Sequence, residues 1–205
     1  MAPMGDFHFP MAAVRPASVL SPAQAEVRRP RWVGWVASAR HGDKAAFTSL
    51  HDHFCGMVHG IVVSKVPASD APDLTQDVFV IALQKLTTLE DDAAFGGWLA
   101  QVTRTRIARF LRDRPMHDEL PDEVQVAAPD ASGAPDARKV LVALRALPEA
   151  YSETLAMRLI EGMTGPEIAE RTGLTAGSVR VNLHRGMALL REKLGLAPSE
   201  VSSNE

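Results

Sequence analysis

Between residues 167 and 185 the chain reads Glu167-Ile-Ala-Glu-Arg-Thr-Gly-Leu-Thr-Ala-Gly-Ser-Val-Arg-Val-Asn-Leu-His-Arg185. The spacing of Ala169, Gly173 and Val179 predicts a short helix, a turn and a second helix. A small residue suits a close helix crossing, and glycine adopts the positive φ of a tight turn without steric cost. The β-branched Val179 would then bury the second helix against the first. The pattern therefore predicts a helix-turn-helix, whose second helix enters the major groove of DNA.

The second helix is expected to begin after Thr175, because threonine caps helix starts well. Val179, Leu183 and Met187 are expected to face inward. The side chains expected to point outward, towards DNA, are Ser178, Arg180, Asn182 and Arg185. Arginine can bind guanine and asparagine can bind adenine, whereas serine contacts phosphate. The alternative is the solvated polar face of an ordinary helical hairpin.

A second basic helix is predicted from Phe95 to Arg114, ended by Pro115. At about 100° per residue, Ile107, Phe110 and Leu111 fall within one third of its circumference. The arginines sweep most of the opposite side: Arg104, Arg106, Arg109 and Arg112. Such a face can follow the phosphates of single or double strands. It can also be only a solvated basic face. Phe95 and Trp98 could stack on bases, but their spacing favours a place in the core.

Two polar clusters have ordinary explanations beside functional ones. Asp70, Asp73 and Asp77 lie near a predicted helix start, where carboxylates stabilise the positive end of the helix dipole. They could also form an acidic patch for a basic partner.

His51, Cys55 and His59 lie on one side of a predicted helix and carry possible zinc ligands. Three ligands in line span about 12 Å, so only an adjacent pair could share one ion. A buried cysteine beside partly exposed histidines explains the same pattern. We therefore assign no metal, no cofactor and no catalytic residue.

Charge is distributed unevenly over the 205 residues, whose formal net charge is -3. Residues 116–137 contain six acidic and no basic residues, whereas residues 138–195 contain nine basic and six acidic residues. The predicted helix-turn-helix thus has a locally basic environment. The single cysteine excludes an internal disulfide and fits the reducing cytoplasm. No apolar run approaches the ~20 residues needed to span a bilayer, so no stable membrane insertion is expected.

Composition divides the chain into five segments. Residues 1–31 are rich in proline and alanine and are predicted to be a disordered extension. Residues 32–115 and 138–195 carry helical periodicity, and residues 116–137 are predicted to be a flexible acidic linker. Residues 196–205 form a tail. Because no period-two strand pattern occurs, the predicted fold is all-α, with two small helical domains joined by the linker.

Five short sequences occur in an order that resembles the extracytoplasmic-function (ECF) group of the sigma-70 family, the smallest bacterial RNA polymerase sigma factors. They are Gly42-Asp-Lys-Ala-Ala-Phe47, Asp73-Leu-Thr-Gln-Asp-Val-Phe79, Phe95-Gly-Gly-Trp-Leu99, Ala146-Leu-Pro-Glu149 and the stretch from 167 to 185. Each is weak alone, but five in order are specific. The resemblance assigns residues 32–115 to sigma region 2, a helical bundle, and residues 138–195 to sigma region 4.

The resemblance implies a promoter-specificity subunit that is not an enzyme. Asp73, Gln76 and Asp77 would lie on the helix that docks on the coiled coil of the polymerase β′ subunit. The β flap is a second expected contact. Residues 89–94 and the arginine helix would recognise and melt the minus-ten element, capturing single-stranded bases. The second helix of the helix-turn-helix would bind the duplex minus-thirty-five element.

Some positions depart from the family's pattern. Arg104-Thr105 stands where Arg-Asn is usual, and Arg180-Val-Asn182 stands where Lys-Ser-Arg is common. These differences predict an altered promoter preference. The resemblance also implies an anti-sigma factor and a stress or envelope-signal response. The alternatives are a stand-alone helix-turn-helix regulator, which would bind duplex DNA without polymerase, and a metal sensor using His51, Cys55 and His59.

Overall fold

Capping side chains set the limits of the first helices. The computed structural model describes residues 30–113 and 137–196. Helix α2 spans Arg31–Arg40 and α3 spans Lys44–Val63. Between them, the Asp43 carboxylate accepts hydrogen bonds from the backbone N–H groups of Ala45 and Ala46. It thereby satisfies donors that the first turn of α3 leaves without helical partners.

Helices α4 (Ala71–Lys85) and α5 (Phe95–Asp113) complete the first part of the chain. Proline stands in the first turn of α4, where its missing N–H costs nothing. Two short 3-10 helices, η1 (Leu86–Thr88) and η2 (Asp92–Ala94), connect α4 to α5. The Asp91 carboxylate accepts from the Ala93 N–H and starts η2.

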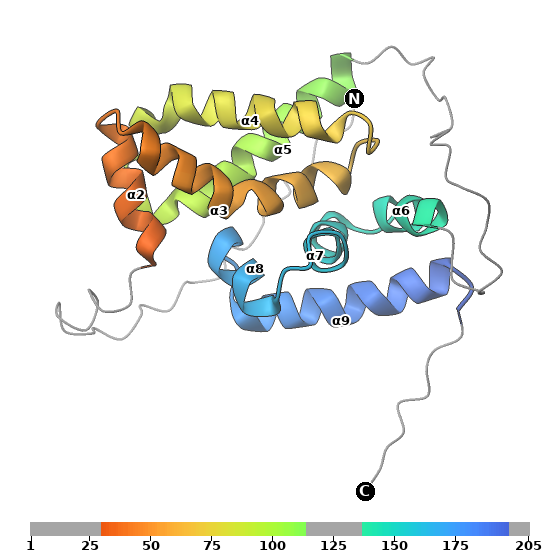
Figure 1. Ribbon diagram of the computed structural model, residues 1–205. Coiled ribbons are helices and arrows are strands. Elements are labelled where there is room, and N and C mark those ends of the chain that lie inside the picture. The colour runs from red at the N-terminus through yellow and green to blue at the C-terminus, as the bar shows by residue number, and fades with distance from the viewer. Residues whose placement is uncertain (1–29, 114–136, 197–205) are drawn as a thin grey trace, which may run out of the picture. The chain divides into compact units, whose positions relative to one another are not determined.

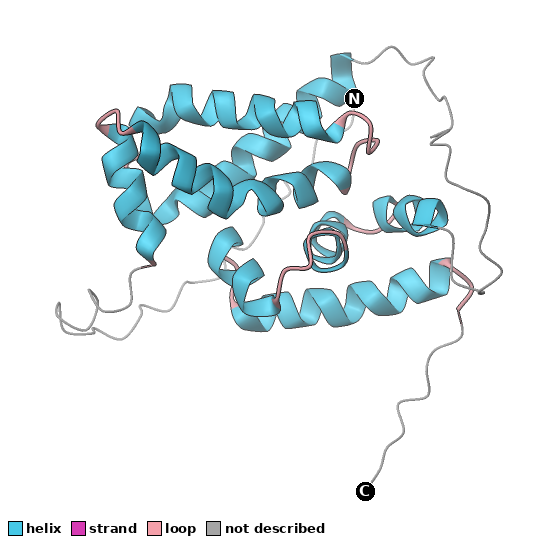
Figure 2. Cartoon of the chain, viewed as in Figure 1, coloured by secondary structure: helices cyan, strands magenta, loops and turns pink. Residues whose placement is uncertain are grey.

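The second part consists of α6 (Ala137–Arg145), α7 (Glu149–Leu159), α8 (Gly165–Thr172) and α9 (Ala176–Lys193). Figure 2 shows helices and loops and no strand among the described residues. The all-α prediction is therefore confirmed for this part of the chain. None of the described helices is long and apolar enough to cross a membrane.

The aromatic centre of the first part joins three helices. Phe54 of α3 meets Trp32 of α2 and Phe95 of α5 edge to face, with ring centroids 5.4 and 5.0 Å apart. Such edge contacts add to the burial of the rings themselves. Phe95 is fully buried and Trp98 packs partly buried against the same core, which confirms the prediction that both are core residues.

Helix α7 lies at the centre of the described helices, between α3 and α9 (Figure 1). Its residues from Ser152 to Met157 are all buried, so it has no solvated face over that length. The helices from α2 onward belong to one compact unit. The predicted extension lies outside the described residues except for Pro30 and Arg31, and the predicted linker except for Ala137. Of the predicted tail, only Leu196 is described.

A capping box begins α8. The Thr164 side chain accepts from the Glu167 N–H, and the Glu167 carboxylate accepts from the backbone N–H and the hydroxyl of Thr164. The pattern Thr164-Gly-Pro-Glu167 predicts this arrangement, and the structure confirms it. The backbone and side-chain hydrogen bonds from Thr164 lower the pKa of Glu167.

We predict that Thr164→Ala destabilises the protein by about 1 kcal/mol, as loss of an N-cap does elsewhere. Urea denaturation followed by circular dichroism measures this change. Because the folded-state pKa of Glu167 is depressed, its contribution is present above the unfolded-state pKa and is lost as the pH falls through the folded-state pKa. The cost of Thr164→Ala should therefore shrink on acidification. The control is Thr105→Ala, at an exposed position inside α5.

Candidate nucleic-acid interface

The turn between α8 and α9 has the predicted geometry. Gly173 ends α8 in the left-handed region, with φ of 76°, and its N–H bonds to the Ala169 carbonyl. The Thr175 side chain accepts from the Ser178 N–H and caps α9. Val179 is fully buried, and Leu183 and Met187 pack partly buried against the core. The predicted helix-turn-helix and its inward face are thus confirmed.

The outward residues of α9 differ in accessibility. Ser178, Arg180 and Arg185 are exposed. Asn182 is half-buried, and its amide donates to the Thr154 hydroxyl of α7 at 3.4 Å. At about 100° per residue, five positions place Arg180 and Arg185 on different sides of the helix. The four predicted DNA-contacting residues therefore belong to one helix but do not form a single face.

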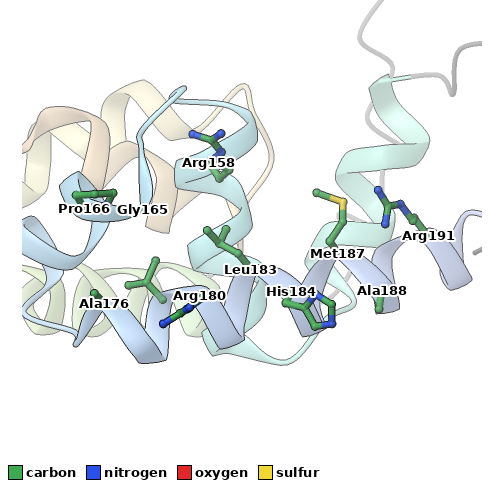
Figure 3. A pocket seen from close by; sticks show the side chains of 11 residues that line it. Arg158, Gly165, Pro166, Ala176, Arg180, Leu183, His184, Met187, Ala188 and Arg191 are labelled. Atoms are coloured by element: carbon green, nitrogen blue, oxygen red, sulfur yellow. The ribbon is translucent and has the colours of Figure 1, made fainter. Parts of the chain in front are cut away.

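A groove runs along α9 on the Arg180 side (Figure 3). It encloses about 570 Å³, and Leu183 and Met187 are among its apolar lining residues. Its basic lining residues are Arg158, Arg180, His184 and Arg191. Sequence reasoning had identified only Arg180. The positions of His184 and Arg191, four and eleven residues after Arg180, are a helical spacing that could have revealed them.

The arginines of α5 point in three directions. Arg109 and Arg112 are exposed, and Arg109 lies 3.6 Å from the Asp113 carboxylate. Arg106 donates twice to Asp77 of α4, at 3.2 and 2.6 Å. Leu111, expected in the apolar stripe, is 46% exposed. The arginines of α5 therefore do not share one solvent-exposed basic face. Arg109 and Arg112 face solvent, whereas Arg106 pairs with α4 and Arg104 with α7.

Arg104 makes the contact with α7. Its Nε and Nη2 atoms donate to the two carboxylate oxygens of Glu153 at 2.9 and 2.7 Å. Glu149 lies 3.4 Å from the same guanidinium. The hydrogen bond to Glu153 raises the pKa of Arg104, and the charges of Glu153 and Glu149 act in the same direction. Glu153 is 4% exposed, and a carboxylate buried to this degree needs a charged hydrogen-bonding partner, which Arg104 supplies.

One face of α4 is acidic at its start and apolar further along. Asp73, Gln76 and Asp77 are exposed there, as docking on a partner requires. Val80 and Leu83 are 54% and 55% exposed, and they follow Asp73, Gln76 and Asp77 along α4 at helical spacings of three and four residues. Sequence reasoning had not singled out these two residues. We call Asp73, Gln76, Asp77, Val80 and Leu83 the α4 face.

The histidines of α3 have protein partners. Nδ1 of His51 lies 3.1 Å from Asp52, and Nδ1 of His59 lies 2.5 Å from Glu161. Among the described residues, no group of three or more His, Cys, Asp or Glu could hold a metal ion. Burial raises the pKa of the Cys55 thiol, and the charges of Glu161 and Asp52 raise it further.

Comparison with known proteins shows the family to which the chain belongs. Residues 50–115 match the family model for sigma-70 region 2, and residues 137–190 match the model for sigma-70 region 4. The chain belongs to the sigma-70 family, in its ECF group. It is an RNA polymerase sigma factor, and the members of this family are transcription-initiation factors. The ECF expectation from the five short sequences is thus confirmed.

Several curated sigma factors are similar in sequence to this chain. The probable RNA polymerase sigma factor RfaY of Xanthomonas campestris is 32% identical over 144 residues, which cover 65% of this sigma factor but only 36% of that protein. The RNA polymerase sigma factor CarQ of Myxococcus xanthus is 29% identical, over 80% of this chain and 97% of that protein. The ECF RNA polymerase sigma-E factor of Haemophilus influenzae is 25% identical, over 78% and 93%.

The fold also resembles a solved structure, that of CnrH in complex with the cytosolic domain of CnrY. The TM-score is 0.51 at 24% sequence identity, and the alignment covers 80% of this chain and 96% of that one. This likeness supports the helical fold of the sigma factor.

We predict that the Cys55 thiol reacts with a disulfide reagent more slowly in the native sigma factor than in the urea-unfolded chain. Only the thiolate reacts, and burial raises the pKa of this thiol. The release of thiol from the reagent at neutral pH measures the rate. Equal rates in native and unfolded protein would contradict the prediction.

Proposed function

We propose that this sigma factor binds core RNA polymerase, directs it to specific promoters and assists promoter melting. The observation that carries the proposal is the capped helix-turn-helix, in which α9 exposes Arg180 and Arg185 while Val179 anchors the helix. The first turn of α9 offers Ser178 and backbone N–H groups to phosphate. We assign α9 to the minus-thirty-five element.

The minus-ten element is assigned to α5. Arg109 and Arg112 are exposed and can contact phosphates directly. Arg104 and Arg106 belong to the same proposed site, although each is hydrogen-bonded to a carboxylate in this structure. The residues before α5 would contribute to capturing unpaired bases, as the family resemblance implies.

Core polymerase is proposed to bind the α4 face. Its exposed carboxylates suit a basic partner surface, and its exposed Val80 and Leu83 add apolar area. The partner is the coiled coil of the β′ subunit, with the β flap contacting region 4. Once one part of the sigma factor is bound to polymerase, the effective concentration of its other parts near the promoter DNA rises, so that several weak contacts together bind tightly. We place the protein in the cytoplasm, where its polymerase works.

An anti-sigma factor is proposed as the regulatory partner, in a stress or envelope-signal response. The solved structure with the similar fold is a complex with the cytosolic domain of a second protein. A stand-alone helix-turn-helix regulator is not favoured, because the chain matches region 2 as well as region 4.

The direct test is run-off transcription with purified core polymerase and this sigma factor on promoters of the source genome. We expect initiation at specific start sites. Asp73→Lys should weaken core binding, measured by the sigma factor concentration at half-maximal run-off, because it places a positive charge in the α4 face. Asp52→Lys is the matched control, since Asp52 is exposed on α3, outside the α4 face.

No run-off product from any promoter, despite folded protein, would overturn the function. Equal effects of Asp73→Lys and Asp52→Lys would remove the assignment of the α4 face and leave the function standing.

A second prediction concerns the minus-thirty-five element. If Arg180 binds a base there, Arg180→Ala should lower the amount of run-off product by a factor that corresponds to about 1–3 kcal/mol of lost DNA contact. The reduction should be larger for promoters whose minus-thirty-five element carries the base that Arg180 contacts than for promoters that lack it. Lys44→Ala removes the same charge at an exposed position on α3 and serves as the control. A uniform loss over all promoters would reassign Arg180 to phosphate.

A further inference from the structure

The exposed side of α9 has an apolar residue near its centre and basic residues at its edges. Its exposed side chains include Arg180, Val181, His184 and Arg185. At about 100° per residue, Arg180 and Arg185 lie about 140° apart around the helix, and Val181 and His184 lie between them. Figure 3 shows Leu183 on one side of α9 and His184 on the other. Val181 therefore belongs to the side that faces away from the core.

Val181 is not needed to bury α9. It is 44% exposed, whereas Val179 is fully buried and Leu183 packs partly buried against the core. A β-branched side chain in a helix is held in essentially one rotamer. Val181 thus presents two methyl groups in a fixed orientation, and a partner that contacts them loses little affinity to the ordering of this side chain.

Gly177, one turn before Val181, leaves the same side of the helix open. It lies inside α9, and its φ is not positive. Among the described residues, a Cβ atom there would approach only the Thr175 hydroxyl oxygen, at 3.8 Å, which is an ordinary contact. Neither backbone conformation nor packing requires glycine, although glycine destabilises a helix relative to alanine. Close approach of the backbone to a ligand is another use of glycine, and it fits this position.

Asn182 lies on a different side of α9 from Val181. It is half-buried, and its amide donates to the Thr154 hydroxyl of α7 at 3.4 Å. Both partners belong to region 4, so this bond directs Asn182 towards α7 within its own region. The side chain near the centre of the exposed side is therefore the valine, not the asparagine from which the sequence predicted a contact with adenine.

We propose that Val181 is a specificity-determining residue that contacts the 5-methyl group of a thymine in the minus-thirty-five element. The inference rests on the proposed function, which assigns α9 to that element. A helix with its side chains is about 10–12 Å across and the major groove is about 12 Å wide, so the middle of the exposed side lies deepest. Thymine carries a methyl group on its major-groove edge, which apolar side chains contact.

The same side chain acts against the other bases. Valine can neither donate nor accept a hydrogen bond, so it cannot replace the water on the amino group of cytosine or adenine. Covering such a group without a partner is unfavourable. Arg180 and Arg185, on either side, supply the positive charge that holds the helix in the groove. Charge then contributes affinity, and Val181 contributes the preference for thymine.

The test uses core polymerase with the full-length sigma factor and a promoter library whose minus-thirty-five element is randomised. Sequencing of the bound DNA identifies the preferred element and its thymines. Each thymine is then replaced singly by deoxyuridine, which lacks only the methyl group, and competition binding compares the two DNAs. We expect one position at which deoxyuridine weakens wild-type binding by about three- to fourfold, the effect of exposing one methyl-sized group.

Two valine substitutions provide a matched pair. Val181→Ser removes both methyl groups, and serine and valine have similar helix propensities. At the sensitive position, Val181→Ser should bind thymine and deoxyuridine equally. Val142→Ser is the control, because Val142 is 56% exposed on α6, outside α9. It should keep the wild-type difference between the two bases. Circular dichroism checks that both variants are folded.

Two results would overturn the role of Val181. In the first, no thymine of the preferred element can be replaced by deoxyuridine with a loss of wild-type binding. In the second, Val181→Ser keeps the wild-type difference, since another residue then contacts the methyl group.

Failure of this inference differs visibly from failure of the proposed function. If the holoenzyme enriches no sequence and gives no run-off product, the proposed function fails, and the role of Val181 fails with it. If an element is enriched but either of the two results is found, the function stands and Val181 does not contribute to the recognition of thymine.

Discussion

The packing of α7 between α3 and α9 is the constraint on which the rest of the described structure depends. Gly60 on α3 admits Met157, and Gly186 on α9 lies where a Cβ would be 3.0 Å from Leu155 and 3.1 Å from Tyr151. One glycine on each side thus lets the backbone of α7 come close to both neighbours. A helix held this way has no solvated face over this length. Every side chain from Ser152 to Met157 must therefore pack against, or hydrogen-bond to, a neighbouring part of the protein.

That constraint explains how a carboxylate occupies the middle of the structure. Glu153 faces α5 and is almost fully buried, and an ionised carboxylate in such a place requires a charged hydrogen-bonding partner. Arg104 supplies it with two hydrogen bonds, while its own side chain stays 37% exposed. Solvent on the arginine side screens the pair, so it is weaker than a fully buried one. Such a pair can hold a specific arrangement and still be broken by a competing anion.

Local chemistry was predictable from the sequence, and long-range pairing was not. Thr164, Gly173 and Thr175 act within one turn of their own position, so their roles follow from residue type and spacing alone. The arginines of α5 reach partners 29 and 49 residues away in sequence, Asp77 and Glu153. Helical periodicity places them on a circumference but cannot say which neighbour covers each part of it.

The same limit applies to the contact between the two regions and to Asn182. Composition indicated separate helical segments, and nothing in the pattern around Gly60 announced a close approach of another helix. This glycine lies in a sequence that fits an ordinary amphipathic helix. A glycine inside a helix lowers its propensity, and that cost was the only available signal of a packing role.

The burial of α7 also bears on how the molecule is assembled during synthesis. Helices α3 and α5 leave the ribosome before α7, by an interval on the order of seconds at usual elongation rates. Once made, α7 meets a surface that already presents Gly60 and Arg104. The side of α7 that packs against α9 stays uncovered until α9 has been translated. The N-terminal helices therefore provide the surface on which α7, and after it α9, can pack as the chain is completed.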